Sequence, residues 1–213
     1  LKRFVTIPKV QIGLGIIGFF TLVAILGKPF ATYVLHRSPT DVFLEAMGTG
    51  QSLAHPMGTT VSGQDVLTWM LHGTYNSMFV GFVSAIIATI LALVIGTLGG
   101  FLKGWPDAVI NGFILVFQNI PSFPVLIIMA AFWRDMPLFA VAALVGIFEW
   151  TGGARRIRAQ TMSLRRRDFT TALRTVGESK LRIVLVEVLP HLFGIVSPMF
   201  LSAIAAGVGM QAS

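Results

Sequence analysis

Histidine and cysteine are the side chains that most often bind metals or carry acid–base and nucleophilic chemistry, and this chain uses them sparsely. It has no cysteine, which excludes disulfides, thiolate metal sites and a cysteine nucleophile. The four histidines lie far apart along the chain: His36, His55, His72 and His191. None has the spacing of metal ligands, so we predict no metal site. We interpret His55 as a structural residue of a turn before Pro56, with a metal site there as the alternative.

Nucleotide chemistry is not expected either, because the phosphate-binding pattern G-x-x-x-x-G-K-[ST] does not occur. Gly27-Lys28 lacks both the preceding glycine and the following hydroxyl residue. No nucleophile and base form a recognisable constellation. We therefore predict that the chain is not an enzyme, that it has no catalytic residue, and that it carries no cofactor of its own.

The remaining candidates for functional residues are polar side chains inside apolar segments. These are Gln118, Asn119, Ser122 and Glu149. Pro121 and Pro124 interrupt the segment that holds the first three, and the freed backbone groups must face protein or a water-filled cavity. Intramembrane polar residues line pathways or join helices, and both roles stay open for these three. Glu149 is expected to form a local ion pair with Arg155 or Arg156.

The elements that position these residues are predicted from the composition. Only 12% of the 213 residues are charged and 54% are hydrophobic, whereas soluble domains have about 25% charged residues. Such a chain has too little polar surface for a soluble fold of this size. We therefore predict a membrane protein.

Five segments have the length and apolarity of membrane spans, with the fourth rather short. They cover residues 10–30, 77–101, 108–133, 137–150 and 192–213. The fourth can continue as a helix into the basic stretch after it. The predicted fold is one domain over residues 1–213, an all-α polytopic transmembrane helix bundle. Because five spans put the termini on opposite faces and the chain stops inside an apolar run, we expect a sixth helix to be missing.

The basic residues orient the bundle, because Lys and Arg gather in cytoplasmic loops. With the N-terminus in the cytoplasm, the cytoplasmic segments hold Lys2, Arg3, Lys9, Lys103, Arg155, Arg156, Arg158, Arg165, Arg166, Arg167, Arg174, Lys180 and Arg182. The outer segments hold only Lys28, Arg37 and Arg134. This distribution accounts for the net charge of +7, so we expect no nucleic-acid partner.

Two connections are too long to be simple turns. Residues 31–76 are predicted to form an extracytoplasmic loop, and residues 151–190 a cytoplasmic loop. Within the second, Phe169, Ala172, Leu173 and Val176 recur at helical spacing. They predict a short amphipathic helix that Gly177 ends, and that lies on the bilayer surface or docks in a groove of a partner.

The second loop, RDFTTALRTVGESKLRIVLVEVLP at residues 167–190, resembles the EAA loop of binding-protein-dependent ABC importer permeases. The residues that match are Ala172, Gly177, Arg182, Ile183, Leu189 and Pro190. Thr171 stands where that family has Glu, and Leu173 where it has the second Ala.

The first loop contains HPMGTTVSGQDV at residues 55–66, which resembles the HPLGTDxLGRDV signature of the peptide/nickel subfamily. The residues that match are His55, Pro56, Gly58, Thr59, Gly63, Asp65 and Val66. Thr60 replaces Asp, and Gln64 replaces Arg. Together the two resemblances indicate the dipeptide/oligopeptide transport family.

That resemblance implies a permease subunit of an ATP-driven importer in a bacterial inner membrane. Its implied partners are a second permease in a heterodimer, two cytoplasmic ATPase subunits that bind ATP and Mg²⁺, an extracytoplasmic substrate-binding protein and the lipid. The implied coupling residues are Phe169, Ala172, Leu173, Arg174, Val176, Gly177 and Glu178. Import of nickel, haem or another small solute is the alternative within the family. A channel or a secondary transporter is the alternative from another class.

Overall fold

The computed structural model describes residues 8–133 and 135–211, and every regular element in those ranges is a helix. Four helices are long and apolar enough to cross a membrane, and a bent pair of helices raises the number to five if the pair is one span. This confirms the all-α polytopic membrane fold. The chain divides into two compact units, Leu1–Phe79 and Val80–Ser213.

The first unit begins with helix α2 (Pro8–Pro29), which continues into a π-helical turn, η1 (Phe30–Val34). A loop containing the short 3₁₀ helix η2 (Leu44–Ala46) leads to α3 (Val66–Phe101), whose first turns belong to this unit. Apolar side chains of α2 such as Phe19 and Leu22 are about 60% exposed, as expected for side chains that face lipid. At Gly27, α2 lies so close to α3 that a Cβ atom would come within 2.9 Å of Leu71.

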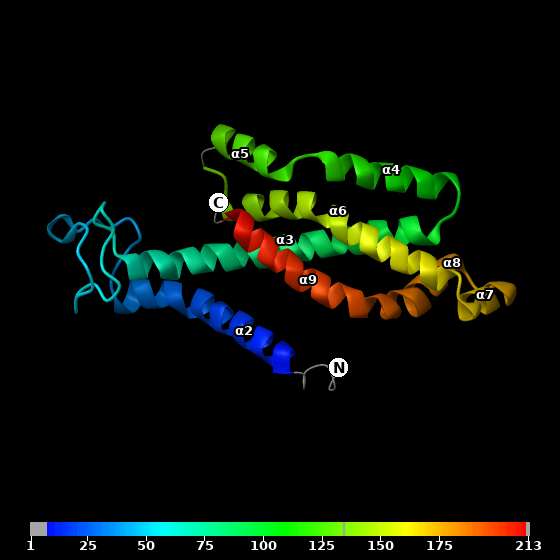
Figure 1. Ribbon diagram of the computed structural model, residues 1–213, viewed down its shortest axis with the longest axis horizontal. Coiled ribbons are helices and arrows are strands. Elements are labelled where there is room, and N and C mark those ends of the chain that lie inside the picture. The colour runs from blue at the N-terminus through cyan, green and yellow to red at the C-terminus, as the bar shows by residue number, and fades with distance from the viewer. Residues whose placement is uncertain (1–7, 134, 212–213) are drawn as a thin grey trace. The chain divides into compact units, whose positions relative to one another are not determined.

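The second unit contains the rest of α3 and all later helices (Figure 1). These are α4 (Trp105–Asn119), α5 (Ser122–Phe132), α6 (Leu138–Arg165), α7 (Asp168–Thr175), α8 (Lys180–Arg182), the π-helical η3 (Ile183–Val188) and α9 (Leu189–Gln211). Helix α6 packs against both α4 and α9. The core between them includes Ile114, Trp150, Ile157 and Leu192, each at most 2% exposed.

Glycines allow α3 and α6 to approach closely in this unit. A Cβ atom at Gly96 would lie 2.6 Å from the carbonyl oxygen of Ala154, and one at Gly100 would lie 2.6 Å from that of Arg158. Small residues at such crossings let membrane helices pack backbone against backbone. We call this contact, in which Gly96 and Gly100 of α3 touch the backbone of α6, the glycine seam.

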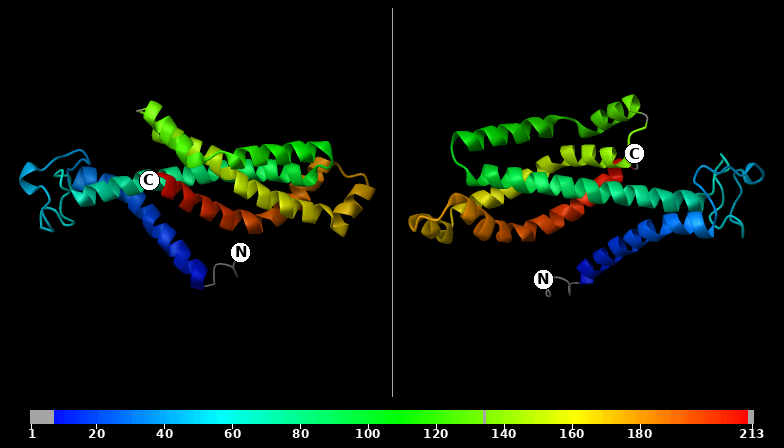
Figure 2. Two further views of the ribbon diagram at one scale, coloured as in Figure 1. Left: turned by 45° about the horizontal axis from the view of Figure 1, so that its top comes forward. Right: turned by 180° about the vertical axis from the view of Figure 1, so that it is seen from behind.

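The predicted break in the third span is confirmed. Helices α4 and α5 are bent by 65° relative to each other at Ile120–Pro121. The change of direction between the two helices is visible in the view from behind (Figure 2). The bend occurs because proline has no amide hydrogen to donate and disfavours helical geometry in the residue before it.

Two helix boundaries differ from those predicted. Helix α3 begins at Val66 instead of residue 77. Polar residues in its first turns hid this start in the sequence. Helix α6 continues to Arg165, as expected for a fourth span that extends as a helix into the basic stretch. Residues 180–190, predicted as loop, belong to a span that runs over Lys180–Met210.

Candidate functional site

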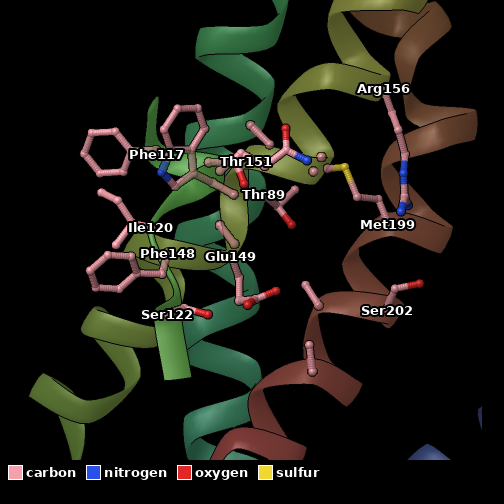
Figure 3. Close-up of a pocket in the computed structure, with 18 residues that line it drawn as sticks. Thr89, Phe117, Ile120, Ser122, Phe148, Glu149, Thr151, Arg156, Met199 and Ser202 are labelled. Carbon is pink, nitrogen blue, oxygen red and sulfur yellow. The ribbon is translucent and has the colours of Figure 1, made fainter. Parts of the chain in front are cut away.

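A cavity of about 410 Å³ lies within the second unit, among α3, α6, α9 and the break between α4 and α5. Its wall combines aromatic and aliphatic side chains with a few polar ones, and Figure 3 shows Thr89, Glu149, Met199 and Ser202 around it. Cavities of this size hold small organic ligands in many proteins. The broken span therefore contributes to the wall of a space large enough for a small solute.

The polar residues at the break have different positions. Gln118 and Ser122 line the cavity, whereas Asn119 does not line it. The Asn119 amide donates a hydrogen bond of 2.7 Å to the carbonyl oxygen of Leu115 in its own helix. The Gln118 side-chain oxygen accepts a hydrogen bond of 2.9 Å from Arg155. Gln118 therefore also joins α4 to α6.

Glu149 lines the same cavity, but its predicted ion pair is not formed. No ion pair or hydrogen bond of the Glu149 side chain occurs within residues 8–133 and 135–211. Arg155 points elsewhere because six helical residues separate it from Glu149, which is about 240° of rotation around the helix. Arg156 also lines the cavity and likewise has no such partner in the part of the chain that the structure describes.

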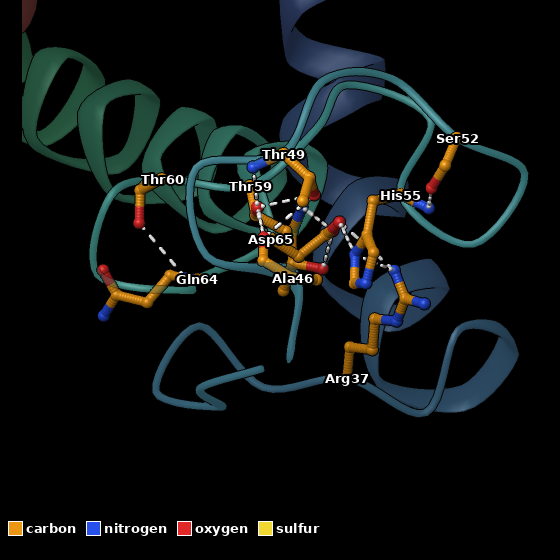
Figure 4. Close-up of polar contacts among 10 residues, drawn as sticks. Arg37, Ala46, Thr49, Ser52, His55, Thr59, Thr60, Gln64 and Asp65 are labelled. Atoms are coloured by element: carbon orange, nitrogen blue, oxygen red, sulfur yellow. Dashed lines mark hydrogen bonds and ion pairs between the residues drawn. The ribbon is translucent and has the colours of Figure 1, made fainter. Parts of the chain in front are cut away.

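A second site is the loop of the first unit, where Asp65 joins several segments (Figure 4). Its carboxylate accepts hydrogen bonds from the Thr68 backbone amide (3.0 Å) and hydroxyl (2.7 Å), which caps the first turn of α3. The Nδ1 atom of His55 and a guanidinium nitrogen of Arg37 lie 3.0 and 3.2 Å from its other oxygen. His55 and Asp65 are 7% and 3% exposed, so the group is buried.

The electrostatics of this group favour a charged carboxylate. Burial by itself raises the pKa of Asp65, but hydrogen bonds from His55 and Thr68 and the positive charge of Arg37 outweigh burial. The pKa of Asp65 therefore lies below its ordinary value of 3.8. A charge that holds together the start of α3, His55 and Arg37 fixes the shape of the loop.

Other residues of the loop signature also hold its fold. Gly58 and Gly63 have φ angles of 76° and 78°, which side chains other than glycine's rarely adopt. A Cβ atom would also meet a backbone oxygen at 2.8 Å at Gly58 and at 3.0 Å at Gly63. Thr59 is buried and its hydroxyl donates a hydrogen bond to the carbonyl oxygen of Ala46, whereas Pro56 is exposed. Most of the signature is therefore explained by the backbone of the loop.

Helix α7 divides its apolar residues between two environments. Phe169 and Leu173 pack against the core of the unit, and the Phe169 ring stacks on His191 of α9 at 5.6 Å. Ala172 is exposed, and Val176 is 76% exposed. Helix α7 ends at Thr175, so Val176 lies beyond its regular turns.

The end of α7 has the geometry predicted from Gly177. This residue has a φ angle of 82°, and the next amide, of Glu178, bonds the carbonyl oxygen of Leu173 at 3.1 Å. That bond spans five residues, as in a Schellman motif. The Glu178 side chain pairs with Arg182 at 3.1 Å. The side chain of Arg174 lies outside the described residues.

Two arginines of α6 have structural roles that the sequence analysis missed. Arg158 donates two hydrogen bonds, of 2.9 and 2.7 Å, to one carboxylate oxygen of Asp107 and so joins α6 to α4. Arg165 is 8% exposed and donates hydrogen bonds to the carbonyl groups of Phe101, the last residue of α3, and of Leu102, which follows it. The seven-residue spacing of these arginines could have indicated that both lie on one side of a helix. It was not used, because the arginines were considered only as cytoplasmic charges.

Comparison with known proteins gives one consistent family. A family model described as "Binding-protein-dependent transport system inner membrane component" matches residues 88–212. The chain is 32% identical over 164 residues to the oligopeptide transport system permease protein OppC of Mycobacterium tuberculosis, which is 76% of this chain and 56% of that protein. It is 27% identical over 157 residues to the dipeptide transport system permease protein DppC of Lactococcus lactis, and the match covers 74% of this chain and 45% of that protein. It is 28% identical over 215 aligned positions to DppC of Bacillus subtilis, and the match covers 94% of this chain and 64% of that protein. The chain thus spans roughly half to two thirds of the length of these relatives.

Proposed function

Because the chain belongs to the binding-protein-dependent transport system inner membrane components, we propose that it is one permease subunit of an ATP-driven importer of dipeptides or oligopeptides. The observation that carries the proposal is the cavity among the spans, whose wall includes the broken α4–α5 segment. Its few polar groups suit a pathway that accepts varied side chains. The names of the relatives, oligopeptide and dipeptide permeases, support the class of substrate.

The proposed location is a bacterial inner membrane, with the N-terminus in the cytoplasm. The distribution of basic residues supports this orientation, although Lys2, Arg3 and Arg134 lie outside the described residues. These 213 residues contain no cysteine, so single-cysteine variants of this sequence permit a direct test. We expect Ser52→Cys to react with an impermeant maleimide in intact cells and Ala172→Cys to react only after lysis, and the reverse pattern would contradict the orientation.

The proposed partners are a second permease in a heterodimer, two ATPase subunits, and an extracytoplasmic binding protein. ATP and Mg²⁺ would bind to the ATPase subunits, and this chain would hold no cofactor or metal. We assign the exposed side chains Ala172 and Val176 to the ATPase contact, with Arg174 and Glu178 at its edge. Phe169 and Leu173 instead anchor α7 to the bundle, and Gly177 turns the chain at its end. Movement of the ATPase surfaces would reach the spans through this anchored helix.

Co-purification of the complete transporter tests this contact with two matched variants. Val176→Asp places a charge just after the end of α7, and Val61→Asp makes the same change at an 87% exposed valine of the loop before α3. We expect Val176→Asp to lose most of the ATPase and Val61→Asp to retain it, because a buried unpaired carboxylate is costly at an interface. Equal recovery of ATPase with both variants would contradict the assignment. Binding of α7 to anionic vesicles, with no ATPase association in wild type, would favour a lipid-surface helix instead.

Transport itself is tested in proteoliposomes that contain the complete transporter and its binding protein. We expect uptake of tri-alanine that requires ATP. Uptake of nickel or haem without peptide uptake would favour the alternative cargo. Peptide flux without ATP would favour a channel or a secondary transporter.

A further inference from the structure

The cavity wall contains two side chains of opposite charge on one helix, Glu149 and Arg156 of α6. They are seven residues apart, so they lie on the same side of the helix and about 10 Å apart along its axis. Figure 3 shows both at the cavity. Neither has a hydrogen bond or ion pair with another residue in the described ranges 8–133 and 135–211.

An unpaired carboxylate within a membrane span is energetically costly, and such residues normally face a counter-charge or water. Neighbouring polar groups do not supply the counter-charge. Thr89 and Ser202 are neutral, and Arg155 is bonded to Gln118. The cavity that Glu149 lines therefore has room for a cation that enters from outside the chain.

A short peptide carries both charges that this wall would bind. Its α-ammonium group is a cation with three hydrogen-bond donors, and its α-carboxylate accepts two hydrogen bonds from a guanidinium group. An extended peptide spans about 3.3–3.6 Å per residue, so a tripeptide separates these ends by about 10 Å. That length is close to the rise of about 10 Å along the helix between the Glu149 and Arg156 Cα atoms.

We propose that Glu149 binds the α-ammonium group and Arg156 the α-carboxylate of an extended peptide of about three residues in this cavity. The proposal rests on the proposed function of peptide import and adds to it a recognition of the peptide ends. The rest of the wall suits varied side chains, because Ala88, Ala92 and Ala203 are small and Met199 is flexible. Selection would then act on the two termini and on length, and not on sequence.

Uptake of three probes by the complete transporter in proteoliposomes tests the proposal. The probes are tri-alanine, N-acetyl-tri-alanine and tri-alanine amide, and the measured quantities are the preferences for a free amino end and for a free carboxyl end. Preferences of the binding protein cancel when each variant is compared with wild type. The variants are Glu149→Gln and Arg156→Gln, with Asp135→Asn as a control that removes an exposed carboxylate before the start of α6.

We expect Glu149→Gln to reduce the preference for a free amino end about tenfold and to leave the preference for a free carboxyl end unchanged. We expect the reverse for Arg156→Gln, and no change in either preference for Asp135→Asn. If Glu149→Gln fails to assemble, Glu149→Asp is measured instead, and an intermediate loss of the amino-end preference is expected.

Two outcomes would overturn the inference and leave the proposed function intact. One is uptake in Glu149→Gln with both preferences at wild-type values. The other is an equal loss for all three probes, which would indicate that Glu149 pairs with a cation of another subunit. If wild type takes up none of the probes, the proposed function itself fails.

Discussion

Neutralising Asp65 should open the loop of the first unit. Its side chain is 1% exposed and holds Arg37, His55 and Thr68 within 3.2 Å. Asp65→Asn keeps an oxygen that can cap α3, since Asn is as good an N-cap as Asp. The variant loses the charge, however, and leaves the guanidinium group of Arg37 against a neutral amide.

The size of the effect follows from these contacts. A hydrogen bond to a charged group stabilises by about 1.5–3 kcal/mol. The Arg37 side chain is 18% exposed and can regain some water, so we expect a loss of about 2 kcal/mol for Asp65→Asn. Asp65→Ala also removes the helix cap and should cost about 1 kcal/mol more.

Amide hydrogen exchange in nanodiscs measures the opening of this loop. The informative amides are those of Phe43, Gly48 and Thr60, which donate to loop carbonyl groups at 2.8–2.9 Å. A loss of about 2 kcal/mol corresponds to exchange about 30-fold faster. The matched control is Asp41→Asn, because Asp41 is an exposed carboxylate of the same loop. Exchange in Asp65→Asn within about twofold of wild type would refute the reasoning.

Acid should have the same effect as the substitution. The folded-state pKa of Asp65 is below 3.8, so the unfolded loop takes up its proton first as the pH falls. The stabilisation is therefore complete above that value and is lost as the pH falls through the lower folded-state pKa. We expect loop protection, corrected for intrinsic exchange, to be constant from about pH 7 to about pH 5 and to fall below about pH 4 in wild type, with a much smaller change in Asp65→Asn.

Three further predictions concern the second unit. Gly177→Ala should destabilise the end of α7 by about 1 kcal/mol because of its positive φ angle, seen as faster exchange of the Glu178 amide with the core unchanged. Gly100→Ala should lower the melting temperature in detergent, since its Cβ would meet a carbonyl oxygen at 2.6 Å, whereas Gly112→Ala, with no atom within 4 Å, should not. Arg158→Gln, Asp107→Asn and their combination should give a coupling energy of about 1 kcal/mol in a double-mutant cycle, and perfect additivity would show that the half-buried pair contributes nothing.

The apolar spans and the break at Pro121 could be predicted because the membrane imposes length and apolarity, and because proline acts locally. The signature glycines were also informative, since Gly58, Gly63 and Gly177 all have positive φ angles. The direction in which each polar side chain points could not be predicted. Asn119 and Gln118 are neighbours in sequence, yet only Gln118 lines the cavity.

Charge distribution was a poor guide to the roles of individual residues. Arg158 and Arg165 were counted as loop charges, but α6 extends far enough to carry them against Asp107 and the end of α3. The ion pair of Glu149 with Arg155 or Arg156 was predicted from closeness in sequence. That prediction failed because closeness in sequence does not tell in which direction a side chain points around a helix. Helical rotation and the extent of the helix had to be known before these side chains could be placed.

The glycine seam has a mechanical consequence. Where two backbones touch, no side chain lies between them that could change rotamer and absorb a displacement, and packed interiors have low compressibility. A push on α7 that moves α6 should therefore move α3 by nearly the same amount. Deformation under such a push would concentrate instead where packing is loose, as at α5, which has no buried residue and contributes Ser122 to the cavity wall.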